Sequence, residues 1–216
     1  MTSIVFNIGF SSEYVIKALT YRGVQGVNKI FLITALPKDE LSKKRNEDAI
    51  TTILNYLNVV GIKNVKVLSV DVNTTFDKIL LQISTELGKI DDDIEIYLIG
   101  GMRILLLSLY YIAQIMSKIK KIKAIAFDES MQNSYELLLT IPKIPATSSQ
   151  IELLKALAKR QSITEVSRKL EKSESTVLKQ IESLGELVDC EKSGKTRECE
   201  ITNIGKVVLN LIQSGA

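Results

Sequence analysis

The sequence predicts an α/β protein in which a mainly parallel sheet carries helices on both faces and is followed by a small, mostly helical domain. Two observations predict this class. As far as residue 127, short β-branched runs alternate with stretches of helical period, and after residue 149 the period is helical until a short hairpin near the end. A proline-containing stretch separates the two patterns.

Five runs rich in β-branched residues predict strands at residues 3–8, 29–34, 65–70, 94–99 and 123–127. Apolar residues at helical spacing lie between them: Val15 and Leu19; Ile50, Ile53, Leu54, Leu57 and Val60; Phe76, Ile79, Leu80, Ile83 and Leu87. Strand-helix-strand units of this length need right-handed crossovers, so the strands are parallel. A sixth run, residues 135–141, has no helix before it, and we expect an antiparallel edge strand there.

The stretch TIPKIPATSS, residues 140–149, holds two of the three prolines and predicts a linker. We therefore expect one domain at residues 1–141, a linker at 142–148 and a second domain at 149–216. With 216 residues, of which 45% are hydrophobic, the chain can bury the cores of two modest domains.

The second domain follows the order of a winged helix-turn-helix. The first helix carries Ile151, Leu154 and Leu157, and a capping box from Ser162 to Glu165 begins the second helix. The third helix begins after Ser173 and ends at Gly185. The last helix carries Ile204, Val207, Val208 and Leu211. Two extended runs, 186–192 and 197–202, surround the turn SGKT before that last helix. Helix, helix-turn-helix, two-stranded wing and closing helix is the order typical of that domain.

The two cysteines of the chain fall on the predicted wing. If Gly194 and Lys195 form a two-residue turn, Cys190 faces Cys199 at a non-hydrogen-bonded pair, where side chains lie closest. A disulfide fits that position. Because cytosolic disulfides are rare outside hyperthermophiles, we expect two neighbouring free thiols unless the source organism grows hot.

Composition excludes several classes of function. The chain has no histidine, which removes the commonest general base, serine-histidine triads and most zinc sites, so we expect no catalytic or metal-ligating residues. The net charge of +3 permits a polyanionic partner without requiring one. The apolar run at residues 104–116 is too short for a bilayer, and no targeting segment precedes residue 4, so we expect a soluble cytoplasmic protein without a membrane partner.

The loops after the first and fourth strands, IGFSSE at residues 8–13 and IGGMR at 99–103, are the candidate site. Ligands of open α/β sheets bind at the carboxyl ends of strands where the strand order reverses. Here Gly9, Gly100 and Gly101 let a ligand approach the backbone, and Ser11 or Ser12 can cap a helix or donate to a phosphate. Two helix N-termini would converge there, a setting that favours anions.

Arg103 stands at the start of an apolar helix, where a cation opposes the helix dipole. With a phosphate between the guanidinium and the helix end, both interactions become attractive, so we interpret Arg103 as an anion-binding residue rather than a solvated surface residue. The loop that begins at Gly9 does not match the dinucleotide fingerprint, and the sequence has no P-loop motif. Both observations disfavour nicotinamide, flavin and nucleoside-triphosphate cofactors.

The third helix of the second domain is the candidate for the DNA major groove. Its outward positions, the residues near phosphates and the wing together give a candidate interface made of Arg168, Lys172, Ser175, Thr176, Lys179, Gln180, Lys192, Lys195 and Arg197. Residues 147–216 contain eleven lysines and arginines against ten acidic residues, a net charge of +1. Either dimerisation doubles a weak half-site, or the domain serves packing; we favour DNA binding.

A strand ending in GF before a helix, a fourth strand ending in GGMR, and the segment ITEVSRKLEKSESTVLKQIESL resemble archaeal CRISPR-associated transcription regulators. In that family an N-terminal CARF domain, which is a Rossmann-like module, precedes a winged helix-turn-helix. The resemblance covers essentially the whole chain.

The resemblance implies a homodimer that binds cyclic oligoadenylate, most often cyclic tetra-adenylate, in a two-fold pocket and binds promoters of CRISPR-associated operons through its winged helices. Carried onto this sequence, the ligand-binding residues are Gly9, Phe10, Ser11, Ser12, Gly100, Gly101, Met102 and Arg103, with Leu36, Pro37, Asn73 and Thr74 at neighbouring strand ends.

Two alternatives remain open at this point. Some CARF proteins cleave the cyclic oligoadenylate that they bind, which needs held geometry and charge stabilisation rather than histidine, and Ser11 and Arg103 are then the candidates. The other alternative is a sensor of a different nucleotide. Our preferred interpretation is a non-enzymatic, ligand-responsive regulator.

Overall fold

The computed structural model describes residues 1–140, 142, 144–145, 147–193 and 196–214 of the chain. The chain forms two compact units, Met1–Thr140 and Ile141–Ala216. Ile141, at the predicted end of the sixth strand, and residues 143 and 146 of the predicted linker lie outside the described residues.

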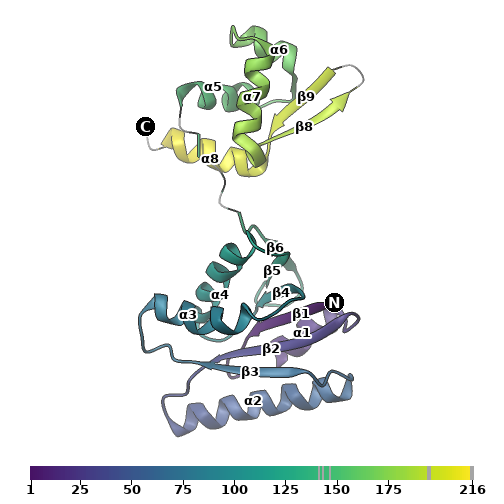
Figure 1. The fold of residues 1–216 in the computed structure, drawn as a ribbon, viewed down its shortest axis with the longest axis vertical. Coiled ribbons are helices and arrows are strands. Elements are labelled where there is room, and N and C mark those ends of the chain that lie inside the picture. Colours follow the sequence, from purple (N-terminus) through teal and green to yellow (C-terminus); the bar gives the residue numbers. More distant parts are fainter. Residues whose placement is uncertain (141, 143, 146, 194–195, 215–216) are drawn as a thin grey trace. The chain divides into compact units, whose positions relative to one another are not determined.

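The first unit is built on a six-stranded sheet with the order β3-β2-β1-β4-β5-β6 (Figure 1). The first five strands pair in parallel, and β6 pairs antiparallel with β5, which confirms the predicted fold class. The elements are β1 (Thr2–Asn7), α1 (Glu13–Arg22), β2 (Val27–Ala35), α2 (Glu40–Val59), β3 (Val65–Val70), α3 (Phe76–Leu87), β4 (Asp93–Leu98), α4 (Arg103–Met116), β5 (Ile122–Phe127) and β6 (Ser134–Leu137).

Each face of this sheet carries its own hydrophobic core. Helices α1 and α2 pack on one face, where Leu19 and Ile53 contact the side of β1 that carries Phe6. Helices α3 and α4 pack on the other face, where Ile83 and Leu109 are buried. Because β1 is covered on both sides, all of its residues from Ser3 to Asn7 are buried, rather than every second one.

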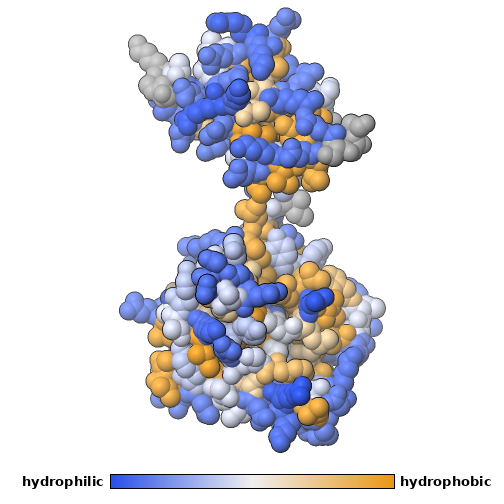
Figure 2. Space-filling model, turned by 180° about the vertical axis from the view of Figure 1, so that it is seen from behind, coloured by the Kyte–Doolittle hydropathy of each residue, from blue (hydrophilic) through white to orange (hydrophobic). Residues whose placement is uncertain are grey.

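Some apolar side chains that the helical period placed in the core are instead exposed. Leu54 is 38% exposed and Phe76 is 40% exposed. On the face opposite to that of Figure 1, apolar patches of the first unit lie among polar ones (Figure 2). Within the described part of the chain, no helix is long and apolar enough to cross a membrane.

The sixth strand ends earlier than predicted. The antiparallel ladder of β5 and β6 stops at Leu137, which pairs with Ala124. The carbonyl of the next residue, Leu138, instead accepts a hydrogen bond of 2.6 Å from the hydroxyl of Tyr110 on α4. Beyond Leu137 the chain is therefore held by a side chain of α4 rather than by pairing with β5.

The second unit has the predicted order of a winged helix-turn-helix, with one short strand that the sequence did not reveal. Strand β7 is that addition; it pairs with β9 and gives a three-stranded sheet of order β7-β9-β8. The elements are α5 (Ser148–Ala156), β7 (Gln161–Ser162), α6 (Ile163–Lys169), α7 (Glu174–Leu184), η1 (Gly185–Leu187), β8 (Val188–Ser193), β9 (Thr196–Ile201) and α8 (Asn203–Ser214).

The helix ends of this unit follow the signals in the sequence. Ser162 and Glu165 form the predicted capping box, and Ser173 caps α7 by accepting from the backbone N–H of Thr176. Gly185 ends α7 with a positive φ of 54°, and the chain then makes one 3-10 turn before β8 begins. On α8, Val207 is 54% exposed and Leu211 is 69% exposed, so only part of its apolar stripe is buried.

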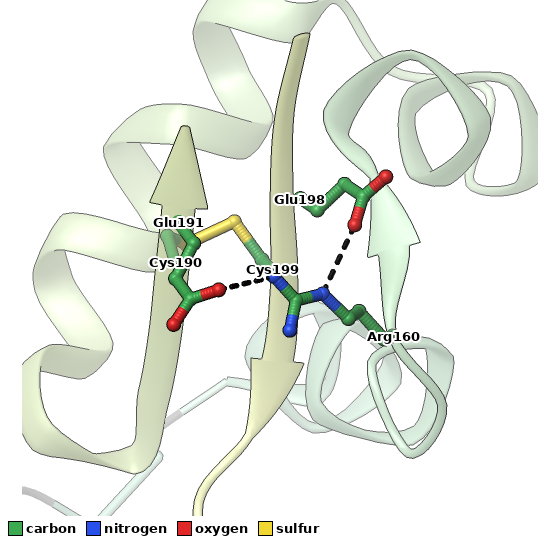
Figure 3. The surroundings of a disulfide bond; sticks show 5 residues. All are labelled: Arg160, Cys190, Glu191, Glu198 and Cys199. Atoms are coloured by element: carbon green, nitrogen blue, oxygen red, sulfur yellow. Dashed lines mark hydrogen bonds and ion pairs between the residues drawn. A yellow bond between two sulfur atoms is a disulfide. The ribbon is translucent and has the colours of Figure 1, made fainter. Parts of the chain in front are cut away.

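The two cysteines of the wing are bonded to each other (Figure 3). Cys190 and Cys199 pair in the predicted register, and their Cα atoms lie 4.1 Å apart. The structure therefore has the disulfide that the sequence left open, rather than the two free thiols expected of a source that does not grow hot, because this closest type of cross-strand pair brings the two sulfur atoms within bonding distance. Gly194 and Lys195, the predicted turn, lie outside the described residues.

Candidate functional site

The two glycine-containing loops meet at the point where the strand order reverses. Strands β1 and β4 are neighbours, and the chain continues from β1 toward β2 on one side and from β4 toward β5 on the other. The loops that follow β1 and β4 therefore leave the same edge of the sheet next to each other. Each of them leads directly into a helix, α1 or α4.

A buried asparagine joins these two loops. Asn7, the last residue of β1, is 0% exposed. Its Oδ1 accepts a hydrogen bond of 3.0 Å from the backbone N–H of Ile99, and its Nδ2 donates to the carbonyl of Gly100. The side-chain amide thus replaces the ladder bonds that end with the strands. Asn7 was not among the predicted site residues; a polar residue at the end of an apolar strand was the available signal.

Two of the three glycines are required by the contact between the loops. A Cβ on Gly9 would lie 2.8 Å from the Cα of Gly101. Gly101 has a φ of 73°, and a Cβ on it would lie 2.5 Å from the carbonyl oxygen of Ile8. Gly100 differs, because its Cβ would make only an ordinary contact of 3.6 Å with Tyr14. Gly100 is thus the glycine that the packing of the loops does not explain.

Arg103 is the first residue of α4 and is exposed. Residue Met102 in the N-cap position has no side-chain acceptor, and the first turn contains no acidic residue. The free N–H groups and the positive dipole of this helix end therefore lie beside a cation with no internal anion to offset them. Among the described residues, the guanidinium of Arg103 has no hydrogen-bond or ion-pair partner.

Two hollows flank the junction of the loops. The first has a volume of about 450 Å³ and lies over the ends of β1 and β2; the second has a volume of about 550 Å³ and lies over the ends of β4 and β5. Gly101 lines both. The first is lined by Ile8, Gly9, Phe10, Thr34, Ala35, Leu36, Pro37, Lys38, Asp39, Ser42, Asn46, Gly101 and Met102. The second is lined by Tyr14, Leu98, Ile99, Gly100, Gly101, Arg103, Leu106, Phe127, Asp128, Glu129 and Met131.

The hollows bring most of the predicted ligand-binding residues together but leave some apart. Ser11 and Ser12 line neither hollow, and the Ser11 hydroxyl accepts from the backbone N–H of Glu13 at 3.3 Å. Asn73 and Thr74 also line neither. Of the predicted residues, those that line the first hollow are Gly9, Phe10, Leu36, Pro37, Gly101 and Met102. Those that line the second hollow are Gly100, Gly101 and Arg103.

One acidic residue of the second hollow is held by its own loop. The carboxylate of Asp128 accepts from the side-chain amide of Asn133 at 2.6 Å, from the hydroxyl of Ser130 at 2.9 Å and from the backbone N–H of Gln132 at 2.9 Å. These hydrogen bonds, that of Asn133 first, lower the pKa of Asp128 below its usual value. Glu129 is exposed at the same rim.

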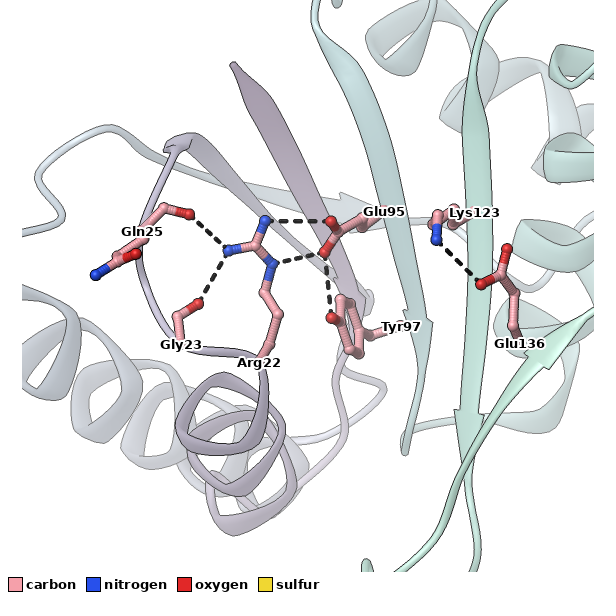
Figure 4. Close-up of polar contacts among 7 residues, drawn as sticks. All are labelled: Arg22, Gly23, Gln25, Glu95, Tyr97, Lys123 and Glu136. Carbon is pink, nitrogen blue, oxygen red and sulfur yellow. Dashed lines mark hydrogen bonds and ion pairs between the residues drawn. The ribbon is translucent and has the colours of Figure 1, made fainter.

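Another polar cluster on the sheet serves the fold. Arg22, at the end of α1, donates to the carboxylate of Glu95 on β4 and to the backbone carbonyls of Gly23 and Gln25 (Figure 4). Tyr97 donates to the same carboxylate at 3.2 Å, and burial raises the pKa of its hydroxyl. Because each group in the cluster is paired, it fixes the end of α1 and leaves no free group for a ligand.

The residues of the candidate DNA interface in the second unit differ in exposure. Ser175, Thr176 and Lys179 are exposed on α7. Gln180, which was expected to face outward, and Lys172, which was expected to lie near phosphates, are half-buried, and both side chains donate to the hydroxyl of Ser149 on α5 at 2.6 Å. Arg168, Lys192 and Arg197 are exposed, and Lys195 lies outside the described residues.

The wing is braced by an ion-pair cluster next to the disulfide. Arg160, just before β7, donates to Glu198 on β9 at 3.0 Å and to Glu191 on β8 at 2.5 Å (Figure 3). The bond to Glu191 is the larger cause that raises the pKa of Arg160 above its usual value. Arg160 therefore pairs with two carboxylates on the wing and offsets one of their two negative charges. Among the described residues, no cluster of three or more His, Cys, Asp or Glu could hold a metal ion.

Comparison with solved structures found partial similarity to regulators. The adhesin competence repressor AdcR of Streptococcus pyogenes is 23% identical over 32% of this chain and 56% of its own, with a TM-score of 0.30. The PcaV transcriptional regulator of Streptomyces coelicolor is 22% identical over 32% and 54%, with a TM-score of 0.30. Lactococcus lactis ZitR, as a mutant in complex with DNA, is 20% identical over 51% and 73%, with a TM-score of 0.29.

This chain covers little more than half the length of the first two of these proteins. At such TM-scores the similarities carry no argument of their own, and the winged-helix assignment rests on the order of elements given above. No curated protein sequence matches the chain. A model of the Csa3 CRISPR-associated Rossmann-like domain matches residues 2–137, which is well over half of the chain. By this match the chain belongs to the CRISPR-associated Csa3 family.

Proposed function

We propose that this chain is a ligand-responsive transcription regulator of CRISPR-Cas genes. Its first unit binds cyclic oligoadenylate, most simply cyclic tetra-adenylate, and its second unit binds double-stranded DNA. Membership of the Csa3 family supports a role in CRISPR-Cas systems. The winged-helix order of the second unit, with exposed Lys179 on α7, supports the DNA half of the proposal.

One observation gives the strongest support to the proposal that the first unit binds cyclic oligoadenylate. The uncapped N-terminus of α4, Arg103 beside it and the sterically unneeded Gly100 lie together at the switch point. Without an anion the cation and the helix dipole repel each other, and with a phosphate between them both attract it. A cyclic oligoadenylate supplies such a phosphate at every nucleotide.

The proposed ligand favours two copies of the chain. Cyclic tetra-adenylate carries four phosphates, whereas one copy offers a single Arg103 at the second hollow. From Arg103 the exposed face of α4 continues as Leu107, Tyr111 and Ile115, spaced four residues apart and 55%, 48% and 51% exposed. We call these three residues the α4 stripe. An apolar stripe that begins at the anion site is the surface on which a second copy would bring a second Arg103 to the same ligand.

The site favours binding over cleavage of the ligand. If the protein cleaved its ligand, the hydroxyl of Ser11 would be a candidate catalytic group. Ser11 lines neither hollow, however, and its hydroxyl accepts a hydrogen bond from the backbone N–H of Glu13 in the same loop. We therefore propose a receptor that releases its ligand intact.

Calorimetry with cyclic tetra-adenylate tests this function. Arg103→Ala should weaken binding roughly tenfold to a hundredfold, the effect of losing a charge-assisted hydrogen bond to phosphate. Lys118→Ala is the matched control, because Lys118 is an exposed cation just beyond the other end of α4 and should bind like the wild type. Equal affinity in both variants would contradict the role of Arg103. Linear products after incubation would assign the site to a nuclease instead.

The DNA half is tested separately, by a mobility shift on the chain's own upstream DNA. Lys179→Ala should weaken the shift, because it removes an exposed cation from the predicted recognition helix. Lys206→Ala removes an exposed cation from α8, outside the helix-turn-helix, and should leave the shift unchanged. If both variants shift DNA like the wild type, α7 is not the recognition helix in the manner proposed.

A further inference from the structure

The first hollow contains a buried polar pair in otherwise apolar surroundings. Thr34, the penultimate residue of β2, is 3% exposed, and Asn46 on α2 is 6% exposed. The hydroxyl of Thr34 donates to the Oδ1 of Asn46 at 3.0 Å. Both side chains line the hollow. Among the described residues, the Nδ2 of Asn46 has no hydrogen-bond partner. The residue is buried but its Nδ2 is not fully covered, so its N–H groups are available to a polar group of a ligand in the hollow.

The remaining wall suits a flat, apolar ring. Ile8, Ala35 and Pro37 contribute apolar surface. At the same hollow Phe10 is 59% exposed and Met102 is 43% exposed, although large apolar side chains are usually covered. An exposed aromatic side chain at the mouth of a hollow is available for stacking on a base. The volume of about 450 Å³ lies in the range of small-molecule sites, about 300 to 1,000 Å³.

The charges in this hollow do not single it out for a phosphate. Lys38 and Asp39 both line it with opposite charges, and the hydrogen bond from the backbone N–H of Ser42 lowers the pKa of the Asp39 carboxyl. The cation and the uncapped helix end lie at the second hollow, with Arg103. Gly101 lies between the two. A nucleotide placed across Gly101 therefore has its phosphate on one side and its base on the other.

We propose that the first hollow binds a purine base of the ligand and that Asn46 is the residue that selects adenine. The amide offers N–H donors at Nδ2 and one remaining acceptor lone pair at Oδ1, because the Thr34 hydroxyl occupies the other lone pair. At its N7 edge adenine presents the complementary pair, the ring nitrogen N7 that accepts and the amino group that donates, and asparagine is its usual bidentate partner. At the same edge hypoxanthine and guanine carry a carbonyl where adenine has the amino group, so they offer two acceptors there.

This inference rests on the proposed function and extends it to base selectivity. The test compares cyclic tetra-adenylate with cyclic tetra-inosinate, which has the same phosphates and sugars, by calorimetry on the full chain. Wild type should prefer the adenylate by roughly tenfold or more. Asn46→Ala should lose affinity for the adenylate only, which brings the ratio close to one. Arg103→Ala should weaken both ligands equally and preserve the ratio.

The outcomes separate the two proposals. Failure of wild type to bind either ligand overturns the proposed function. Adenylate binding without a preference over the inosinate, or a preference that survives in Asn46→Ala, overturns the selector role alone. If Asn46→Ala does not fold, judged by loss of its thermal transition, Asn46→Gln replaces it. That variant keeps an amide but moves it by one methylene, so the ratio should also fall, and an unchanged ratio counts against Asn46.

Discussion

Gly100 and Gly101 are adjacent glycines at the loop junction, but they differ in whether a side chain would fit there. Gly101 adopts a positive φ of 73° and approaches the carbonyl of Ile8, so only glycine fits. Gly100 has room for a methyl group against Tyr14. The fold therefore requires glycine at position 101. It does not require glycine at position 100, where the absence of a side chain leaves room for a ligand.

This difference predicts opposite effects of the same substitution. Gly101→Ala should destabilise the first unit by at least about 1–3 kcal/mol, because it combines backbone strain with a clash. Gly100→Ala should change stability by less than about 0.5 kcal/mol, while its methyl group, in the second hollow, weakens binding of cyclic tetra-adenylate. Urea unfolding followed by circular dichroism measures the first effect, and calorimetry the second. Equal stability of the two variants would refute the distinction.

At this scale the sequence revealed the site only in part. The glycines and Arg103 were recognisable, because a tight strand-to-helix turn and a cation at a helix start leave local signatures. Asn7 and Asn46 were not, since each acts through partners far away along the chain: Asn7 bonds Ile99 and Gly100. The local signal of Asn7, a polar residue at the end of an apolar run, does not identify its partners, and no local pattern distinguishes the buried Asn46 from an asparagine on the surface of a helix.

Among the elements, β3 and α3 are joined by a cluster whose effect depends on pH. Glu86, near the end of α3, accepts from Lys66 on β3 and from Lys89 at 2.9 Å. The bond from Lys66, followed by that from Lys89, lowers the pKa of Glu86 from 4.5 to about 2. In the unfolded chain the carboxyl regains its ordinary pKa and takes up a proton that the folded chain does not bind. The stabilisation is therefore present above the ordinary pKa and is lost as pH falls toward about 2.

This linkage predicts the behaviour of Glu86→Gln. At neutral pH the variant should be less stable than the wild type, and the difference should shrink as pH falls below about 4.5. Urea unfolding at a series of pH values between neutral and about 3 measures it. Glu47→Gln is the control, since Glu47 is exposed on α2 and has no ion-pair partner among the described residues. A constant difference between Glu86→Gln and the wild type at every pH would contradict the assignment.

The elements also show where sequence patterns stop being informative. Helix starts with a capping serine, such as Ser162 and Ser173, were predicted correctly because the signal is local. The two-residue strand β7 was missed because it exists only through its pairing with β9. The register of Cys190 and Cys199 followed from the hairpin, but their oxidation state could not be derived from the register, because it depends on the redox compartment and the growth temperature of the source.

On the scale of the whole molecule, the crevice depends on a strand order that the sequence alone does not specify. Alternation of strands and helices predicts parallel strands, but several orders satisfy it. The order β3-β2-β1-β4-β5-β6 places the loops after β1 and β4 side by side, and that adjacency makes their residues into one site. The long-range contact of Gly9 with Gly101 is its direct consequence.

The α4 stripe is the surface through which two copies of the chain are proposed to meet. If two copies meet through the α4 stripe, a carboxylate placed within it must be buried without a partner, at a cost on the order of 3 kcal/mol or more. Ile115→Glu should therefore sediment as one chain at concentrations where the wild type sediments as two. Val59→Glu makes the same change at the far end of α2, where the side chain is already 85% exposed, and should behave like the wild type.

The same variant connects assembly to ligand binding. Ile115 lies three turns along α4 from Arg103, so its replacement leaves the anion site of one copy intact. If the ligand needs both copies of Arg103, Ile115→Glu should bind cyclic tetra-adenylate more weakly, and the ligand should drive part of the variant back to the dimer, because a ligand that binds only the dimer stabilises it by mass action. Full affinity in a chain that remains monomeric with ligand bound would show that one copy is sufficient and would remove the two-fold pocket from the proposal.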